Sequence, residues 1–464
     1  MGHLYIAAAH KSSGKTSVSV GLTAALVKRG LAVQTFKKGP DYIDPLWLAR
    51  AAGKPCYNLD FFTQTHKEIT TTFASKLVNA DIGLIEGNKG LFDGVDVAGS
   101  DSNAALASML DAPVVLVIDT GGMTRGIAPL IRGYLDFDPG VNICGVILNK
   151  VGGARHESKL RAALERYTSA EVLGAIGRDS ALEIPERHLG LIPANEATGP
   201  TAANTMISRL ADAVSAGVDL DRLINIANAA GLPAGIDYPS KNQSSGTKPD
   251  VRIAIARDAA FGFYYPDDLE AFEKAGAELI PFDTLNDSQL PDADGLFIGG
   301  GFPETHLKAL SANQSLLKEI RQALAAGMPA YAECGGLMYL SRNIQWRGED
   351  GDMVGAVPAD VLVGERPQGR GYMIVEESGD SPWLPIPDTN SDGVPVHEFH
   401  YARLENLAEN PVFAHRVLRG TGIDGAHDGL VINKLLAGFA HHRNTTANPW
   451  VERFVTFVRE QSAL

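Results

Sequence analysis

The feature that most constrains the fold is a regular alternation, along the first half of the chain, of short apolar segments with helical segments. The apolar segments are rich in strand-forming residues and almost uninterrupted by charge, as expected for strands covered on both faces. Such strands, alternating with helices, predict a parallel sheet with helices on both sides, an α/β fold. The predicted strands lie at residues 4–9, 31–37, 81–87, 112–119 and 141–149, with helical stretches at 16–29 and 155–167.

A second α/β pattern begins after a polar interruption. Residues 238–250, YPSKNQSSGTKPD, contain Ser, Gly, Pro and Lys and almost no apolar side chains, which is typical of a linker. Apolar segments resume at 251–258, and the chain of 464 residues is too long for one ordinary core. We therefore expect two α/β domains, at residues 1–237 and 250–464, joined by a linker at 238–249.

Charge and cysteine content narrow the classes of function. The chain has 41 Lys and Arg against 55 Asp and Glu, a formal net charge of −14, so its surface is expected to repel nucleic acid and anionic membranes. No apolar run approaches the roughly 18 residues of a membrane span, and no secretory signal opens the chain. Cys56, Cys144 and Cys334 are too few for a disulfide framework. We expect a cytoplasmic protein that binds neither nucleic acid nor membrane.

Residues 8–17, AAHKSSGKTS, predict a nucleotide-binding loop. They follow a predicted strand and open a predicted helix, so backbone N–H groups would point at phosphates while Lys15 supplies positive charge. The usual pattern has glycine where this chain has Ala9, which would narrow the loop without removing these features. A loop that only happens to read Gly-Lys-Thr is disfavoured by this context. The residues expected to bind the nucleotide are Ser12, Ser13, Gly14, Lys15 and Thr16, with Thr16 also expected to hold Mg²⁺.

Three carboxylates are expected to join Thr16 at the same edge of the sheet. Asp41 and Asp44 lie in FKKGPDYIDP, just past the second predicted strand, and Glu86 ends another predicted strand. Ligands of α/β sheets bind at the carboxyl ends of strands, and hard oxygen ligands suit Mg²⁺. The alternative is that Asp41 and Asp44 serve only as turn and helix-cap residues.

Residues 331–340, YAECGGLMYL, predict a nucleophile elbow with cysteine as the nucleophile. A strand that ends at Cys334 and runs through two glycines into a helix favours the thiolate, and the following N–H groups can form an oxyanion hole. The alternative, a buried structural cysteine, is disfavoured by the paired glycines. A cysteine nucleophile needs a base. Sequence distance does not rank the four candidates, which are His397, His400, His441 and His442.

Five motifs in this order resemble the cobyrinic acid a,c-diamide synthase family along nearly the whole chain. They are KKGPDYIDP, EGNKGLFDG, GGGFPE, AECGGLMYL and HEFHY. The family pairs an ATP-binding domain, similar to dethiobiotin synthetase, with a class I glutamine amidotransferase domain. The resemblance therefore implies an N-terminal P-loop domain with a parallel sheet and a C-terminal amidotransferase α/β domain.

The activity implied by the resemblance is an ATP- and glutamine-dependent amide synthesis on a cyclic tetrapyrrole polycarboxylate. ATP would phosphorylate a peripheral carboxylate, at the a and c acetate groups, and ammonia released from L-glutamine would displace phosphate from the acyl phosphate. ATP and Mg²⁺ are the implied cofactors, and a homodimer is compatible with the resemblance. The chemistry agrees with the motifs, because phosphoryl transfer needs a phosphate cradle and amide hydrolysis needs a thiolate with a base.

The family's functional residues match positions in both predicted domains. In the first, the match assigns Mg²⁺ binding and phosphoryl transfer to the three carboxylates, and adenine recognition to Asn149. Tyr42 and Ile43 fall on the substrate side. In the second, it assigns nucleophile, base and oxyanion roles to Cys334, His441, Gly300, Gly301 and Gly335. The adjacent His442 leaves the choice of base open.

The sequence departs from the family pattern on the substrate side of the first domain. Lys38 stands in place of valine, Asn88 and Lys89 in place of Val-Met, and Tyr57 in place of arginine. Because a polycarboxylate substrate needs local positive charge, Lys38 and Lys89 are expected to bind substrate carboxylates, the alternative being solvated loop charges. The departures leave the tetrapyrrole open, with sirohydrochlorin or sirohaem as alternatives to a cobyrinic acid.

A function of another class is a non-catalytic ATP-dependent switch of the deviant P-loop kind. Lys11 suggests it, since such proteins carry an extra lysine early in the loop. Lys11 lies four residues before Lys15 rather than the usual five, and an intact elbow at Cys334 has no purpose in a switch. Glutaminase activity would separate the two hypotheses.

Overall fold

The computed structural model describes residues 2–187, 190–196, 199–231, 248–386 and 392–462 of the chain. These divide into two compact units, Met1–Gln243 and Ser244–Leu464. The predicted linker at 238–249 lies mostly outside the described residues, so its boundaries stay a prediction. No helix in the part of the chain described here is long and apolar enough to cross a membrane.

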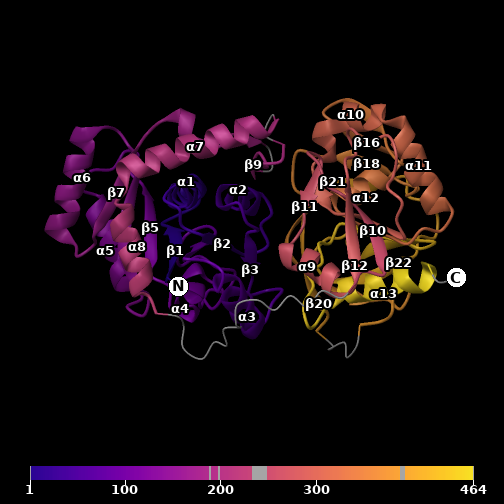
Figure 1. The fold of residues 1–464 in the computed structure, drawn as a ribbon, viewed down its shortest axis with the longest axis horizontal. Coiled ribbons are helices and arrows are strands. Elements are labelled where there is room, and N and C mark those ends of the chain that lie inside the picture. The colour runs from indigo at the N-terminus through magenta and orange to yellow at the C-terminus, as the bar shows by residue number, and fades with distance from the viewer. Residues whose placement is uncertain (1, 188–189, 197–198, 232–247, 387–391, 463–464) are drawn as a thin grey trace. The chain divides into compact units, whose positions relative to one another are not determined.

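The first unit is built on a seven-stranded sheet in which every neighbouring pair is parallel (Figure 1). This confirms the predicted fold class of the N-terminal half. Across the sheet the strands are β3 (Tyr57–Leu59), β2 (Val33–Lys38), β4 (Ile82–Glu86), β1 (Gly2–Ala8), β5 (Val114–Asp119), β6 (Ile143–Val151) and β7 (Val172–Gly177).

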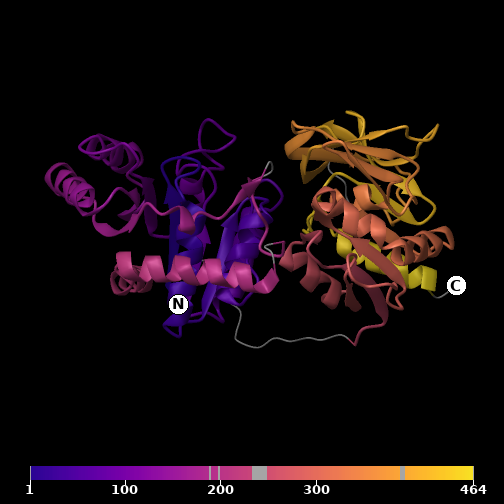
Figure 2. The same ribbon diagram turned by 90° about the horizontal axis from the view of Figure 1, so that it is seen from above.

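Two hydrophobic cores cover the two faces of this sheet, because successive strand side chains point to opposite faces. Leu4 and Ile6 pack into one core, and Tyr5 and Ala7 into the other. The first core is closed by α1 (Lys15–Lys28), α2 (Ile43–Ala52), α7 (Gly199–Gly217) and α8 (Leu220–Ala229). The second is closed by α3 (His66–Leu77), α4 (Asn103–Met109), α5 (Ile127–Phe137) and α6 (Ala154–Tyr167). Figure 2 shows α7 as the long helix of this unit.

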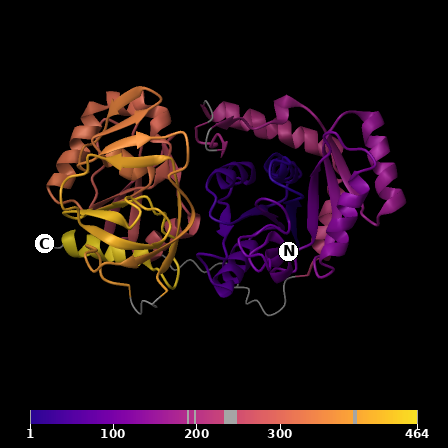
Figure 3. The same ribbon diagram turned by 180° about the vertical axis from the view of Figure 1, so that it is seen from behind.

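The second unit contains a nine-stranded mixed sheet, whose orange-to-yellow strands come to the front in Figure 3. Its first five strands are parallel and carry the predicted elbow: β12 (Ala277–Phe282), β10 (Val251–Ala256), β13 (Gly295–Ile298), β15 (Ala330–Glu333) and β24 (Leu435–Gly438). The sheet continues with antiparallel strands, which are β23 (His427–Ile432), β22 (Phe413–Arg419), β19 (Gly369–Glu377) and β20 (Val394–His400).

Helices cover both faces of the parallel part of this second sheet. One core contains residues of α10 (Leu307–Ala312), α11 (Gln314–Ala325) and α12 (Gly335–Leu340), and the other contains residues of α9 (Pro266–Lys274) and α13 (Trp450–Ser462). Smaller elements complete the unit, namely the pair β11 (Phe261–Phe263) with β14 (Gly300–Gly301), and a sheet of β17 (Glu349–Asp352), β16 (Asn343–Trp346), β18 (Asp360–Val363) and β21 (Ala402–Glu405). The predicted α/β class of the C-terminal half is also confirmed.

Candidate functional site

The loop between β1 and α1 has the backbone of a phosphate cradle. Ser12 and Gly14 adopt left-handed conformations, with φ of 64° and 82°, and the Ser13 hydroxyl donates to the carbonyl of His10 at 2.8 Å. A Cβ on Gly14 would lie 2.2 Å from Asn149 Nδ2, so this position requires glycine. No side chain caps α1, which leaves its first N–H groups for an anion.

Lys15, the first residue of α1, brings a positive charge to the loop. Among the described residues its ammonium makes no hydrogen bond or ion pair. Burial lowers its pKa, and the nearby Lys37 lowers it further against the opposing effect of the Glu86, Asp44 and Asp41 carboxylates. A lysine in this state gains most from a bound phosphate, which would restore its full charge.

Lys37 lies at the centre of the three predicted carboxylates. Its side chain is 1% exposed, and its Nζ lies 2.5 Å from Asp44 Oδ2, 3.0 Å from Glu86 Oε1 and 3.7 Å from Asp41 Oδ2. Burial would lower the pKa of Lys37, but the Asp44, Glu86 and Asp41 carboxylates together raise it well above its usual value. Lys37 is thus a buried, permanently charged cation, and sequence reasoning missed it in favour of its neighbour Lys38.

Thr16 joins two of these carboxylates directly. Its hydroxyl lies within hydrogen-bond distance of Glu86 Oε1, at 2.9 Å, and of Asp44 Oδ2, at 3.3 Å. Burial raises the pKa of Glu86, whereas Lys37 outweighs burial at Asp44 and lowers the pKa of that carboxyl. The three residues therefore meet at one place, as the sequence predicted, at the carboxyl ends of β2 and β4.

Asp41 has a double role. Its Oδ1 accepts hydrogen bonds from the backbone N–H groups of Ile43, at 2.8 Å, and Asp44, at 3.2 Å, so it caps the start of α2. Its Oδ2 faces Lys37. The turn-and-cap alternative therefore describes one oxygen of Asp41, while the other belongs to the charged cluster. Tyr42 is buried and Ile43 is the first residue of α2.

The oxygen atoms of this cluster are of the kind that Mg²⁺ binds. Glu86 Oε2 is buried and has no hydrogen-bond partner among the described residues. Across those same residues no three His, Cys, Asp or Glu side chains form a ready-made metal-binding group. Mg²⁺ usually binds one or two carboxylates together with phosphates and water. Thr16, Asp44 and Glu86 fit that partial site.

Lys38 and Lys89 differ from each other in environment. Lys38 is only 5% exposed, yet in the described part of the chain its ammonium makes no hydrogen bond or ion pair. Burial lowers its pKa, opposed by Asp60 and Asp101 and reinforced by Lys89. Lys89 is exposed and has a left-handed backbone, with φ of 40°. The two lysines are thus near enough to influence each other.

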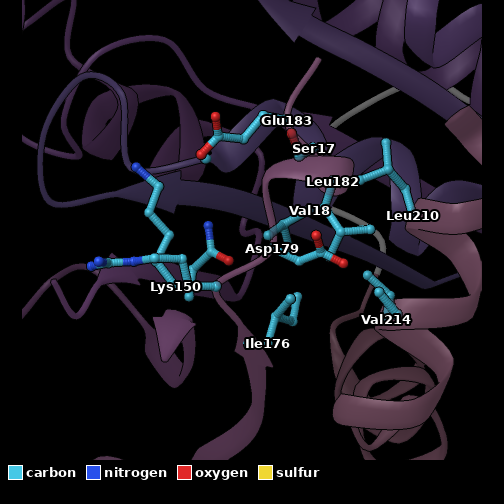
Figure 4. Close-up of a pocket in the computed structure, with 14 residues that line it drawn as sticks. Ser17, Val18, Lys150, Ile176, Asp179, Leu182, Glu183, Leu210 and Val214 are labelled. Atoms are coloured by element: carbon cyan, nitrogen blue, oxygen red, sulfur yellow. The ribbon is translucent and has the colours of Figure 1, made fainter. Parts of the chain in front are cut away.

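A pocket lies beside the P-loop, lined by both apolar and charged side chains (Figure 4). Its apolar side chains are Val18, Ile176, Leu182, Leu210 and Val214, and Lys150, Asp179 and Glu183 add charge. Asn149 also lines it, and its Nδ2 uses one of its two N–H groups to donate to the carbonyl of Ser13 at 2.9 Å. Lys150, which sequence reasoning did not single out, donates to Ser12 O and Asp119 Oδ2.

In the second unit the predicted elbow is present. Cys334 links β15 to α12 with φ of 48° and ψ of −102°, a strained conformation, and its N–H donates to Gly438 O at 2.7 Å. A Cβ on Gly335 would lie 2.9 Å from Gly301 N, so the backbone at Gly335 lies close to the backbone at Gly301, the two positions predicted to bind the oxyanion. A Cβ on Gly300 would lie 2.5 Å from His441 Cε1. These glycines therefore leave the space that the histidine and a substrate oxygen need.

The structure separates the four candidate bases. Burial lowers the pKa of His441, but the neighbouring Cys334 and Glu333 side chains outweigh burial and raise that pKa to about 10. The ring of His442 instead hydrogen-bonds Asn448 Nδ2 at 3.1 Å. His400 hydrogen-bonds Ala402 O and stacks on a phenylalanine, and burial lowers the pKa of His397 to about 3. His441 is the histidine paired with the thiol.

Comparisons with known proteins match both units. Residues 4–192 match the CobQ/CobB/MinD/ParA nucleotide binding domain, and residues 252–448 match the CobB/CobQ-like glutamine amidotransferase domain. The cobyrinate a,c-diamide synthase of Magnetococcus marinus is 46% identical over 464 residues, covering 99% of this chain and 98% of that protein. Those of Methanosarcina acetivorans, 41% identical over 94% of this chain and 91% of that protein, and Syntrophotalea carbinolica, 39% identical over 99% of both, are also similar.

Proposed function

Because this chain belongs to the cobyrinate a,c-diamide synthase family, we propose that it converts the a and c acetate carboxylates of cobyrinate to amides, with ATP as energy source and glutamine as nitrogen donor. The observation that carries the proposal is that each unit has one complete set of reactive groups. The first unit combines an unpaired P-loop lysine with a charged carboxylate cluster, and the second combines a strained cysteine with a charged histidine.

In the first unit the reaction is an activation of the carboxylate. A substrate carboxylate oxygen attacks the γ-phosphorus of ATP, the bond to ADP breaks, and an acyl phosphate forms. Lys15 and the α1 N–H groups bind the phosphates. Lys37, beside Asp44 and Glu86, would stabilise the negative charge on the phosphoryl group during its transfer. Ammonia then attacks the acyl carbon, and phosphate leaves with one former carboxylate oxygen.

The charge balance of the cluster supports a role for Mg²⁺. Asp41, Asp44 and Glu86 bring three negative charges when all are ionised, against two positive charges from Lys37 and Lys15. Burial opposes that state, because it raises the pKa of Asp41 to about 7 and also raises the pKa of Glu86. Thr16, Asp44 and Glu86 would hold the ion, which supplies positive charge to the phosphates of the bound nucleotide. Asp41 would instead keep α2 and Lys37 in place, since its Oδ1 is occupied by backbone N–H groups. The base of ATP would occupy the pocket of Figure 4 against Asn149.

In the second unit glutamine is hydrolysed. The Cys334 thiolate attacks the side-chain amide carbon, the negative oxygen is received by N–H groups of Gly335 and Gly301, and His441 gives a proton to the departing ammonia. Water then attacks the thioester, His441 takes its proton, and glutamate leaves. Gly300 contributes by leaving room for the His441 ring.

Lys38 and Lys89 are assigned to the substrate. The buried Lys38 ammonium, which has no partner among the described residues, is costly, and a substrate carboxylate would offset that cost. Lys89 is exposed and is assigned to the same place because its charge acts on Lys38. A cobyrinic acid with free acetates offers such groups, and so do sirohydrochlorin and sirohaem.

The test is product analysis by mass spectrometry after incubation with ATP, Mg²⁺, glutamine and either cobyrinic acid, sirohydrochlorin or sirohaem. Each amidation replaces a hydroxyl by an amino group and lowers the mass by that difference. With substrate carboxylates labelled in heavy oxygen, one label per amide should appear in inorganic phosphate. Amides formed without label in phosphate would overturn the acyl-phosphate step. ATP hydrolysis without glutaminase activity would favour a switch instead.

A further inference from the structure

A buried carboxylate lies beside Nδ1 of the His441 ring. Glu333, the last residue of β15, is 3% exposed, and its Oε2 lies 3.5 Å from His441 Nδ1. Its Oε1 accepts hydrogen bonds from the Tyr331 hydroxyl, at 2.7 Å, and from the backbone N–H of His442, at 3.0 Å. The carboxylate is thus fixed by two donors and directed at the imidazole by its other oxygen.

We propose that Glu333 is the positioning acid of the glutaminase site: it holds His441 by Nδ1, so that Nε2 faces the sulfur of Cys334, and it stabilises the imidazolium. The inference rests on the proposed function, because it gives a role in glutamine hydrolysis to a residue that touches neither glutamine nor ammonia. His441 moves the protons, to the departing ammonia and from the attacking water, and Glu333 exchanges none.

The position of Glu333 in the chain explains how it performs this role. Glu333 and Cys334 are consecutive at the end of one buried strand, so a single rigid element fixes both partners of the imidazole. The backbone of His441 is held from the other side by hydrogen bonds to His397, at 3.2 and 2.7 Å. Arg443, further along the same segment, pairs with Asp267 at 2.7 Å and lies over the Tyr265 ring.

The charged and titratable groups around His441 favour its protonated form. From the elbow, Cys334 and Glu333 raise its pKa against burial, and the result is about 10. His397, from β20, has its pKa lowered by burial and by His441, and His442 has its pKa lowered mainly by burial. Both histidines are therefore neutral and leave Glu333 and Cys334 as the groups that charge the ring.

The decisive variant is Glu333→Gln, which keeps the shape and removes the charge. Loss of the anion lowers the pKa of His441, so the alkaline limb of the pH profile of glutaminase kcat/KM should move to lower pH. At neutral pH, kcat should fall about tenfold to a thousandfold, with little change in KM for glutamine, as for loss of a group that acts through a catalytic base. Synthesis from ammonium salts should be unchanged.

A second measurement keeps the proposal testable if glutaminase activity becomes too low. Alkylation of Cys334 by iodoacetamide reports the thiolate, which depends on the charged imidazole. Burial raises the pKa of both Cys56 and Cys144, so neither competes. Alkylation of Glu333→Gln at neutral pH should be slower than that of the unmodified chain. Identical pH dependence of alkylation and of kcat/KM in the two proteins would overturn the proposal.

The matched control is Asp428→Asn. Asp428 is an equally buried acid that accepts backbone N–H groups from Phe439 and Ala440, just before His441, but it does not face the imidazole. Its loss should lower thermal stability without moving the alkaline limb. An equal shift in both variants would show a merely structural effect. If Cys334→Ala still hydrolysed glutamine, the proposed function itself would fail, an outcome distinct from a normal pH profile in Glu333→Gln.

Discussion

Replacing Lys37 by methionine tests the charged cluster of the first unit most directly. Methionine matches the length of the lysine side chain but removes the ammonium that contacts Asp44, Glu86 and Asp41 at 2.5, 3.0 and 3.7 Å. Because Glu86 is fully buried, the variant leaves carboxylates without their counter-charge. We expect loss of amide synthesis with either nitrogen source, and a less stable first unit.

The size of the stability effect follows from burial. Removing one partner of a buried ion pair costs about 3–5 kcal/mol, because the other charge stays buried without compensation. A unit of this size loses about 2–4 °C in melting temperature per kcal/mol, so its transition should fall by roughly 6–20 °C. Binding of ATP raises the melting temperature of the unit that binds it, which identifies the transition to follow.

The effect should depend on pH. In the unmodified chain burial alone would raise the pKa of Asp44, but Lys37 outweighs burial and lowers it. The ion pair therefore stabilises the folded first unit at pH values above the ordinary carboxylate pKa, and this stabilisation is lost as pH falls through the lowered pKa of Asp44. In Lys37→Met burial dominates, the pKa of Asp44 rises, and stability decreases as pH rises through that range. The difference in melting temperature should be small near about pH 4 and largest near about pH 8.

The neighbouring lysine provides the control. Lys38 is also buried, but within the described residues it has no ion-pair partner, so Lys38→Met should leave the melting temperature unchanged or higher. Melting curves of both variants, recorded by circular dichroism across this pH range, give the comparison. A pH-independent difference for Lys37→Met, or equal losses in both variants, would refute the electrostatic reasoning.

Four further outcomes are expected. Cys334→Ala should abolish synthesis from glutamine and keep synthesis from ammonium salts, and loss of both in a folded protein would contradict the division of labour. Asp44→Asn or Glu86→Gln should stop synthesis with either nitrogen source while glutaminase activity persists, since a neutral amide replaces an anion. Full synthetase activity in both variants would show that neither carboxylate is needed for phosphoryl transfer. Lys89→Met should raise the Michaelis constant for the true tetrapyrrole about tenfold to a hundredfold, because a charge-assisted hydrogen bond worth about 1.5–3 kcal/mol is lost. A change within about twofold for every tetrapyrrole would show that Lys89 is only a solvated loop charge. Gly300→Ala should abolish glutaminase activity alone, because its Cβ would lie 2.5 Å from His441 Cε1; normal glutamine turnover would show that the ring can move.

The sequence was sufficient for the architecture because buried parallel strands have a pattern of their own. The segment at 112–119 is apolar up to its last residue, Asp119, and the structure has β5 at Val114–Asp119 with its apolar side chains in the cores on both faces. The elbow could also be predicted, since a strand followed by Cys-Gly-Gly allows few alternatives. The structure adds the reason for the glycines, as a Cβ on Gly336 would lie 2.2 Å from Ile298 O.

The choice among histidines needed three-dimensional information. His441 and His442 are adjacent, so their distances along the chain from Cys334 are nearly equal. The His441 backbone pairs with that of His397 and its ring lies beside Glu333, next to the elbow, whereas His442 hydrogen-bonds Asn448. Only strand pairing between β20 and the segment after β24 decides this, and no local pattern encodes such a long-range contact.

The alternation of side chains along β2 could have identified Lys37 from the sequence. In FKKGPD the two lysines are consecutive in β2, so they point to opposite faces of the sheet. Val33 lies four residues before Lys37 and packs in the same core as α1, whose first turn contains Thr16. Phe36 packs in the core on the opposite face. Counting by twos from Val33 places Lys37 on the face of the P-loop helix, and Lys38 on the other. Strand alternation therefore places Lys37 beside Asp44 and Glu86, and Lys38 on the opposite face, which agrees with the different roles proposed for the two lysines.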